Sequence, residues 1–115
     1  MSSHSFIKTV PDSSDVTVTA SGFIQHRCPH VDEDDHGRVD IKWRVNGETL
    51  ELHSLAAYLQ TFRDCEISHE QLTNQIRFDL SLVAQIELVS VETHWNTAGM
   101  EVRCSTSPTR AEVAQ

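Results

Sequence analysis

The chain has 115 residues, is 38% hydrophobic and carries a formal net charge of −8, and this length fits one domain with a modest core. The charge excludes a general nucleic-acid binder, because phosphate contacts need clustered cations and the nine lysines and arginines form no run. There is no apolar run of roughly 18 residues, no signal-peptide pattern and no disulfide-like cysteine set, so we expect a cytoplasmic protein with free thiols and no membrane contact.

Alternating apolar and polar side chains predict the first two strands. Residues 1–14 are polar and Ser-rich and predict a flexible N-terminal arm, and the alternation that follows over 15–24 predicts a strand. Residues 26–37 predict an irregular stretch that is dense in ionisable groups. The clearest strand pattern follows at 38–45, where apolar residues at every second position share one face.

The dipeptide Asn46-Gly47 follows this strand and leaves two alternatives open. By local rules it makes a tight hairpin turn into residues 48–52. It can equally be an exit loop that leads to a helix.

Two amphipathic helices are predicted next. Ser54 can cap the first of them. Ser68, with Gln71 three residues later, has the capping-box spacing and opens the second. The apolar faces of the two helices are Leu55, Tyr58, Leu59 and Phe62, and Leu72, Ile76, Leu80 and Val83.

Two last strands are predicted at about 85–94 and 99–105. The inward-facing residues of the second strand are Met100, Val102 and Cys104. The order of two strands, two helices and two strands predicts an α+β domain over 15–106, with both helices on one face of an antiparallel four-stranded sheet. A C-terminal tail of 107–115 follows. No dinucleotide-binding motif is present, which excludes a nicotinamide cofactor on its usual fold.

Cys28 is the first candidate for chemistry. Its neighbours Arg27, His26 and His30 offer positive charge that would favour a thiolate, and the acidic run 32–35 could supply a proton donor. A nucleophile beside an acid is the arrangement that adds a thiol across a polar multiple bond. The local residues alone, however, favour an inert buried cysteine beside a solvated acidic loop.

A metal site is an alternative for the same stretch. His26, Cys28, His30 and His36 carry nitrogen and sulfur donors of the kind that zinc accepts. Their spacing matches no established zinc pattern, so we expect no metal. Cys65 and Cys104 are interpreted as structural.

The sequence Ser68-His69-Glu70 places two ionisable groups in the first turn of the second helix. The carboxylate of Glu70 could accept hydrogen bonds from the N–H edge of a guanine-like ring, and His69 could contact that ring or move a proton. Taken alone, the same residues are ordinary for a helix start, where backbone N–H groups favour negative charge.

The spacing of these pieces resembles a known family. The matching pieces are Cys28-Pro29, Asp35, Glu51, Thr61-Phe62-Arg63 and His69-Glu70. Over roughly residues 20–105 the chain resembles the 7-cyano-7-deazaguanine reductase family, the QueF group of the tunnelling fold. A single Cys-Pro carries no information, but five features in register are specific.

The resemblance implies roles for these residues. Cys28 would add to the nitrile carbon and form a covalent thioimide, while Asp35 gives a proton to the nitrile nitrogen. Glu70 would bind the guanine-like edge, and His69 would take part in catalysis and binding. The substrate pocket would be completed by Leu50, Glu51 and Leu52. The resemblance also implies a homo-oligomer of decamer-like stacked rings, with sites at subunit interfaces.

The chain departs from the reductases where they hold their cofactor. The reductases have two lysines after the lead-in glutamate that help to bind NADPH, and here His53 and Ala56 stand in their places. A phosphate needs partners that are reliably charged. The QueF-like amidinotransferases lack these lysines too and resolve the thioimide with ammonia to form archaeosine. We therefore expect an amidinotransferase without a cofactor, acting on 7-cyano-7-deazaguanine as a free base or within tRNA or DNA.

Two alternatives stay open. The first is an NADPH-dependent reductase that makes the 7-aminomethyl base, and the second is a non-catalytic or zinc-binding protein for a purine or pterin. The acidic charge weighs against a tRNA substrate unless salt screens it or a basic strip does the docking. That strip would consist of Arg38, Lys42 and Arg44 on one strand face.

Overall fold

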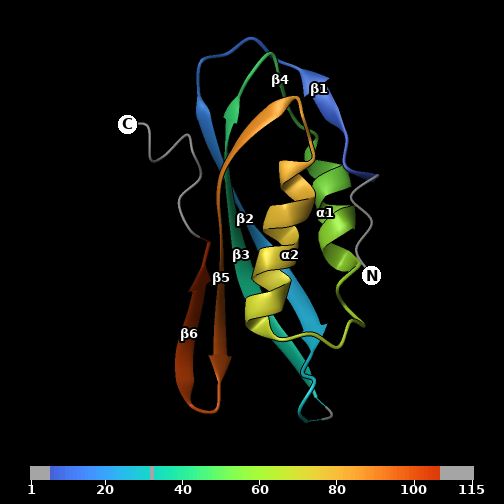
Figure 1. The fold of residues 1–115 in the computed structure, drawn as a ribbon, viewed down its shortest axis with the longest axis vertical. Helices are drawn as coiled ribbons and strands as arrows, with labels where there is room; N and C mark the ends of the chain where they lie inside the picture. The colour runs from blue at the N-terminus through green and yellow to red at the C-terminus, as the bar shows by residue number, and fades with distance from the viewer. Residues whose placement is uncertain (1–5, 32, 107–115) are drawn as a thin grey trace.

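The computed structural model describes residues 6–31 and 33–106, which form an antiparallel four-stranded sheet with two helices on one face (Figure 1). The sheet has the order β2-β3-β5-β6 and consists of β2 (Thr17–Arg27), β3 (Asp34–Val45), β5 (Ile86–Thr97) and β6 (Met100–Ser105). The helices are α1 (Leu52–Gln60) and α2 (His69–Ser81). A second, two-stranded sheet pairs β1 (Thr9–Pro11) with β4 (Glu48–Leu50). The predicted α+β class is confirmed.

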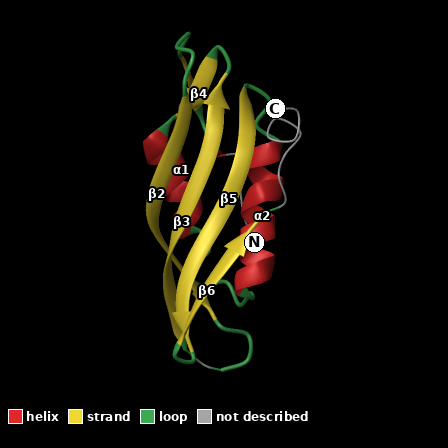
Figure 2. Cartoon of the chain, turned by 90° about the vertical axis from the view of Figure 1, so that its left-hand side faces the viewer, coloured by secondary structure: helices red, strands yellow, loops and turns green. Residues whose placement is uncertain are grey.

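The core lies between the large sheet and the helices. Val39, Ile41 and Trp43 alternate along β3 and are each 1% exposed, and Leu72 and Ile76 of α2 are buried in the same cluster. These are the residues that the alternation and the helical spacing placed on the inner faces. Figure 2 shows β2, β3 and β5 side by side in front of the helices, so the described elements leave the other face of the sheet uncovered. The molecule is accordingly flat, with extents of 45 × 29 × 18 Å.

The irregular stretch predicted over 26–37 is much shorter in the structure. β2 continues to Arg27 and β3 starts at Asp34, with His26 opposite Asp35 in the antiparallel register. The prediction was wrong because ionisable residues were taken as a sign of a loop. Here they lie in paired strands that bury some of them.

The turn at Asn46-Gly47 is present, but β4 does not fold back on β3. It pairs with β1, which lies in the segment expected to be a flexible arm. Gly47 adopts a φ of 80°, which glycine tolerates without strain. The arm prediction is therefore wrong for Thr9–Pro11, whereas residues 1–5 lie outside the described part of the chain.

Helix boundaries follow their caps. Ser68 accepts a hydrogen bond from the Gln71 backbone N–H at 3.1 Å, which confirms that Ser68 opens and caps the second helix. α1 begins earlier than predicted because Glu51, not Ser54, is its N-cap. Met100, expected to face inward, is 60% exposed at the end of β6. Within the described residues, every helix is too short or too polar to cross a membrane.

Candidate active site

Cys28 lies in the short loop that joins β2 to β3. Its backbone N–H donates to the Glu33 carbonyl at 3.1 Å, which closes the loop directly after the strand pair ends. The thiol is half-buried. A pocket of about 310 Å³ opens here, lined by Arg27, Cys28, Pro29, His30, Val31 and Glu66. The hairpin thus presents the cysteine at one end of the sheet, next to open space.

Asp35 sits at the same end of the sheet, in β3. It lies opposite His26 in the register, and both side chains face the helices, with 9% and 1% of their residue surfaces exposed. The His26 Nε2 and Asp35 Oδ2 atoms are 3.8 Å apart. A carboxyl group is therefore held, nearly buried, beside an imidazole and within the hairpin that carries Cys28.

His69 is the first residue of α2 and reaches the same cluster from the helix side. Its Nδ1 lies 2.8 Å from His26 Nε2, and its Nε2 lies 3.0 Å from the Thr97 hydroxyl. Its ring stacks on Trp95 with a centroid distance of 4.3 Å. Burial lowers the pKa of His69, the neighbouring His26 lowers it further, and the Asp35 and Glu70 carboxylates oppose both effects. We expect a neutral ring near pH 7.

Gly37 explains how Trp95 can form the floor of this cluster. The two residues are opposite each other in β3 and β5. A Cβ atom at Gly37 would lie 2.4 Å from the His94 carbonyl oxygen and 2.5 Å from the Trp95 ring, closer than any real contact. The Trp95 indole N–H donates to Thr93, whose hydroxyl bonds Thr73 of α2 at 2.6 Å. The tryptophan is thus fixed from both sides.

Glu70 follows His69 and lies toward β6. Burial raises the pKa of the Cys104 thiol, and the charge of the Glu70 carboxylate raises it further. Cys104 stands opposite Thr93 in the β5–β6 register. Glu70 is an exposed carboxylate in the first turn of α2.

Leu50, Glu51 and Leu52 lie at the other end of the molecule. β3 runs from Asp35 to Val45 before the chain reaches β4, a length of roughly 33 Å at about 3.3 Å per residue. Glu51 accepts hydrogen bonds from the His53 and Ser54 backbone N–H groups at 2.8 Å, which lowers its pKa to about 2. Leu50 is buried. Within one chain these residues do not meet the Cys28 end.

The four residues considered as zinc ligands from the sequence do not come together in the structure. His26 faces the core, His36 is exposed on the opposite face of the sheet, and His30 lies in the loop. Among the described residues, the three-donor group is His26, Asp35 and His69, whose donor atoms lie within 4.8 Å of one another. The two rings already bond each other directly, so we assign this group to hydrogen bonding.

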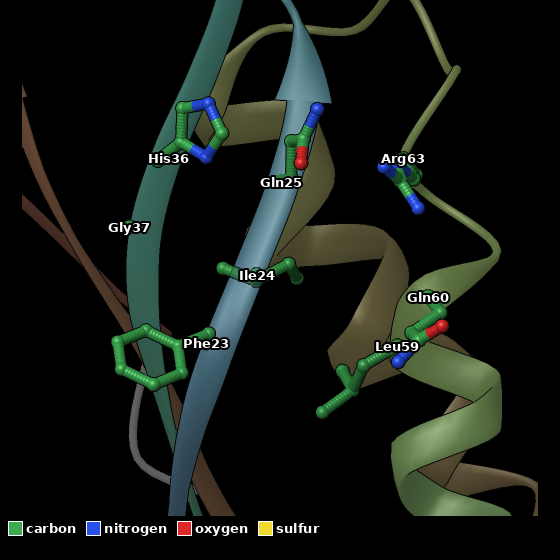
Figure 3. A pocket seen from close by; sticks show the side chains of 8 residues that line it. All are labelled: Phe23, Ile24, Gln25, His36, Gly37, Leu59, Gln60 and Arg63. Atoms are coloured by element: carbon green, nitrogen blue, oxygen red, sulfur yellow. The ribbon is translucent and has the colours of Figure 1, made fainter.

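Phe62 and Arg63, from the matched Phe-Arg segment, have separate roles. Phe62 is 1% exposed and packs edge-on against Tyr58. Arg63 lines a pocket of about 350 Å³ that wraps the outer edge of β2. Figure 3 shows Phe23 and His36 on one side of this strand, and Leu59, Gln60 and Arg63 on the other.

The sequence interpretation missed the partners of the candidate residues. It treated His26 as a neighbour of Cys28 and as a possible zinc ligand, although extending the alternation from Ile24 would have placed it on the buried face. It assigned no role to Trp95, and no sequence signal pointed to Thr97. These contacts join segments that are far apart in the chain.

A family model described as "QueF-like protein" matches residues 34–111, which includes Asp35, His69 and Glu70 and begins after Cys28. Curated proteins named NADPH-dependent 7-cyano-7-deazaguanine reductase are similar. The one from Rhodopirellula baltica is 38% identical over 63% of this chain and 60% of its own length. The one from Frankia casuarinae is 37% identical over 75% of this chain and 69% of its length.

The chain spans about half the length of another relative with the same name, from Prochlorococcus marinus strain NATL2A, which is 33% identical over 64% of this chain and 52% of its own. Among solved structures, the archaeosine synthase QueF-Like in the apo form aligns with a TM-score of 0.72. It covers 82% of this chain and 94% of that chain at 20% identity, so the likeness shows a common fold.

Proposed function

The chain belongs to the QueF-like protein family, and on that premise we propose that it attacks the nitrile of 7-cyano-7-deazaguanine through Cys28 and releases the product with ammonia, as an amidinotransferase. The observation that carries this proposal is the β2–β3 hairpin. It presents the half-buried thiol of Cys28 and holds Asp35, nearly buried, at the same end of the sheet.

The chemistry needs one nucleophile and one acid. The Cys28 thiolate adds to the nitrile carbon and one π bond of the C≡N group breaks. The nitrogen then takes a proton from Asp35. Ammonia then adds to the thioimide carbon and the C–S bond breaks, which returns the thiolate, leaves a formamidine group and releases one proton of the ammonia to solvent. No oxidation or reduction occurs in this sequence.

Substrate binding in this proposal begins with Glu70 and His69. The Glu70 carboxylate accepts from the guanine-like N–H groups, and His69, fixed against Trp95, lines the site. Because Glu51 caps α1 at the far end, it reaches such a pocket only from another copy of the chain. The proposal therefore includes a homo-oligomer, which the flat shape and the uncovered sheet face favour.

The start of α1 favours ammonia over hydride. The family's two cofactor lysines are replaced by His53, whose side chain is fully exposed, and by the exposed Ala56. The His53 ring lies 3.0 Å from the Glu51 carboxylate rather than beside other cations. A site of this kind offers little to the phosphates of NADPH.

The reductase is the second candidate, and two observations favour it. The three curated relatives described above are named reductases. In addition, β1 brings Lys8 to the cap of α1, where its backbone N–H donates to Ser54 and its carbonyl accepts from Glu51. Lys8 could supply one of the missing positive charges.

A free base is favoured over tRNA as the substrate. Two of the three cations of the predicted basic strip are already paired: Arg38 with Asp40, and Arg44 with Asp15. Their positive potential is therefore reduced, and the chain carries a net charge of −8.

The test is product analysis by mass spectrometry. We expect 7-cyano-7-deazaguanine to become the formamidine derivative when ammonium is present, with or without NADPH. An aminomethyl product that forms only with NADPH contradicts the amidinotransferase and identifies the reductase. Stoichiometric zinc, with substrate bound but unchanged, identifies a binding protein.

A further inference from the structure

His26 has no role in the family resemblance, yet the sheet buries it between residues of the proposed site. It is 1% exposed at the end of β2. Its ring contacts His69 and Trp95 edge-on, with centroid distances of 4.9 and 4.8 Å. Asp35 lies 3.8 Å from its Nε2 atom. A buried ionisable ring in direct contact with two proposed site residues needs an explanation beyond packing.

The hydrogen-bond partners fix how the protons are arranged in the neutral cluster. The His26 Nδ1 atom lies 3.2 Å from the Arg27 carbonyl, which can only accept, so Nδ1 carries the hydrogen. His26 Nε2 is then an acceptor and receives a hydrogen bond from His69 Nδ1. His69 Nε2 in turn accepts from the Thr97 hydroxyl. The four groups form one directed chain.

This chain runs from the surface to the proposed acid. Thr97 and His69 are partly exposed, His26 is buried, and Asp35 follows it. The 3.8 Å between His26 Nε2 and Asp35 Oδ2 is longer than a hydrogen bond and too short for a bridging water, so a proton passes between them after a small approach of the two side chains. The described residues thus connect a nearly buried carboxyl to solvent through two imidazoles.

We propose that His26 is a positioning residue that restores the proton of Asp35 through His69 and Thr97. The inference rests on the proposed function, in which Asp35 loses its proton to the nitrile nitrogen. The His69 Nδ1 proton then moves to His26 Nε2, while His69 takes one from Thr97 at Nε2 and solvent replaces it. His26 passes its Nε2 proton to Asp35, and His69 resets its tautomer before the next turnover.

The charges that face His26 come from three elements. β3 presents Asp35, α2 presents His69 and then Glu70, and Arg27 follows in β2 itself. β5 contributes Trp95, which does not titrate. Burial and the neighbouring His26 disfavour a proton on His69, and the Asp35 and Glu70 carboxylates oppose this effect, so the ring passes a proton on rather than keeping it.

The test compares the steady-state rate of formamidine formation, in which Asp35 must be reprotonated in every turnover, in wild type, His26→Gln and the matched control His36→Gln. His36 neighbours Asp35 in sequence but is exposed on the opposite face. The ratio of the His26→Gln rate to the wild-type rate cancels the titration of Cys28. We expect this ratio to fall by about tenfold or more between pH 5 and pH 8, and the His36→Gln ratio to stay near one.

Two outcomes overturn the inference while the proposed function stands. One is a His26→Gln rate equal to that of wild type, and the other is a reduced rate whose ratio is constant with pH, which indicates packing alone. A wild-type protein that forms no adduct contradicts the proposed function instead. If His26→Gln does not fold, nitrogen NMR of the wild type decides: we expect Nδ1–H tautomers on both rings, and an Nε2–H tautomer on neutral His26 overturns the relay.

Discussion

The Glu51 carboxylate is fully engaged by the backbone at the start of α1. It accepts from two backbone N–H groups, which holds its pKa at about 2, below the ordinary glutamate value. A lowered pKa means that the charged carboxylate stabilises the folded state above the ordinary value. This contribution is lost as the pH falls from about 4.5 toward 2.

We therefore predict a pH-dependent effect of Glu51→Gln. Urea denaturation should show wild type more stable than the variant at pH 6, and this difference should shrink at pH 2.5. The variant has no carboxylate at this cap, so its own stability should depend less on pH in this window. An equal difference at both pH values contradicts the role of the cap.

The buried hydrogen bond between Tyr58 and Asp79 gives a second prediction. The Tyr58 hydroxyl donates to Asp79 at 2.5 Å, and the two residues are 0% and 2% exposed. Tyr58→Phe leaves Asp79 with Gln75 as its remaining side-chain hydrogen-bond donor. We expect a loss of about 1–3 kcal/mol in the free energy of unfolding, measured by chemical denaturation. An unchanged midpoint contradicts this.

Strands β3 and β5 are in close contact at Gly37 and Trp95, which stand opposite each other. Gly37→Ala places a methyl group against the His94 carbonyl and the Trp95 ring, so the backbone must shift. We expect a cost of about 1–3 kcal/mol in stability and a change in Trp95 fluorescence. The control is Gly22→Ala in β2, where no atom lies within 4 Å of the added carbon. Equal effects of the two substitutions contradict the account.

Periodicity predicted the elements well where packing follows the local pattern. The alternation of Val39, Ile41 and Trp43 and the helix start at Ser68 were confirmed. The pairing of β4 with β1 could not be predicted, because it joins residues about forty positions apart and Asn46-Gly47 allows several exits. The early start of α1 was missed because glutamate is a less usual N-cap than serine.

Across the whole molecule, both outer strands of the sheet are available for further pairing. Apart from the bridge between Arg27 and Glu66, β2 has no partner on its outer side among the described residues. Phe23 on this strand is 95% exposed. Unpaired edges and exposed aromatic groups are what native sheets normally cover.

We therefore expect an oligomer in light scattering after size exclusion, and we expect Phe23→Glu to reduce its mass. Phe78→Glu is the matched control, since Phe78 is half-exposed on α2, away from the sheet edges. A wild-type monomer contradicts the homo-oligomer and also the use of Glu51 in the substrate pocket.

The candidate site could be predicted from the sequence only as a set of positions. Spacing placed Cys28, Asp35, His69 and Glu70 in the family pattern, and the structure brings Asp35 and His69 into one cluster through His26. For Glu51 the family spacing was not sufficient, because it does not reveal which subunit contributes this residue to a given site. The network of Trp95, Gly37 and Thr97 depends on strand register, which a single sequence does not reveal.

The central claim is that Cys28 forms a covalent bond with the nitrile, and intact-protein mass spectrometry tests it most directly. After incubation with 7-cyano-7-deazaguanine without ammonium, we expect wild type, Cys65→Ala and Cys104→Ala to gain the mass of one substrate molecule. Cys28→Ala should gain none, and ammonium should remove the added mass from the other three. An unchanged wild-type mass, or an adduct that persists in Cys28→Ala, contradicts the claim.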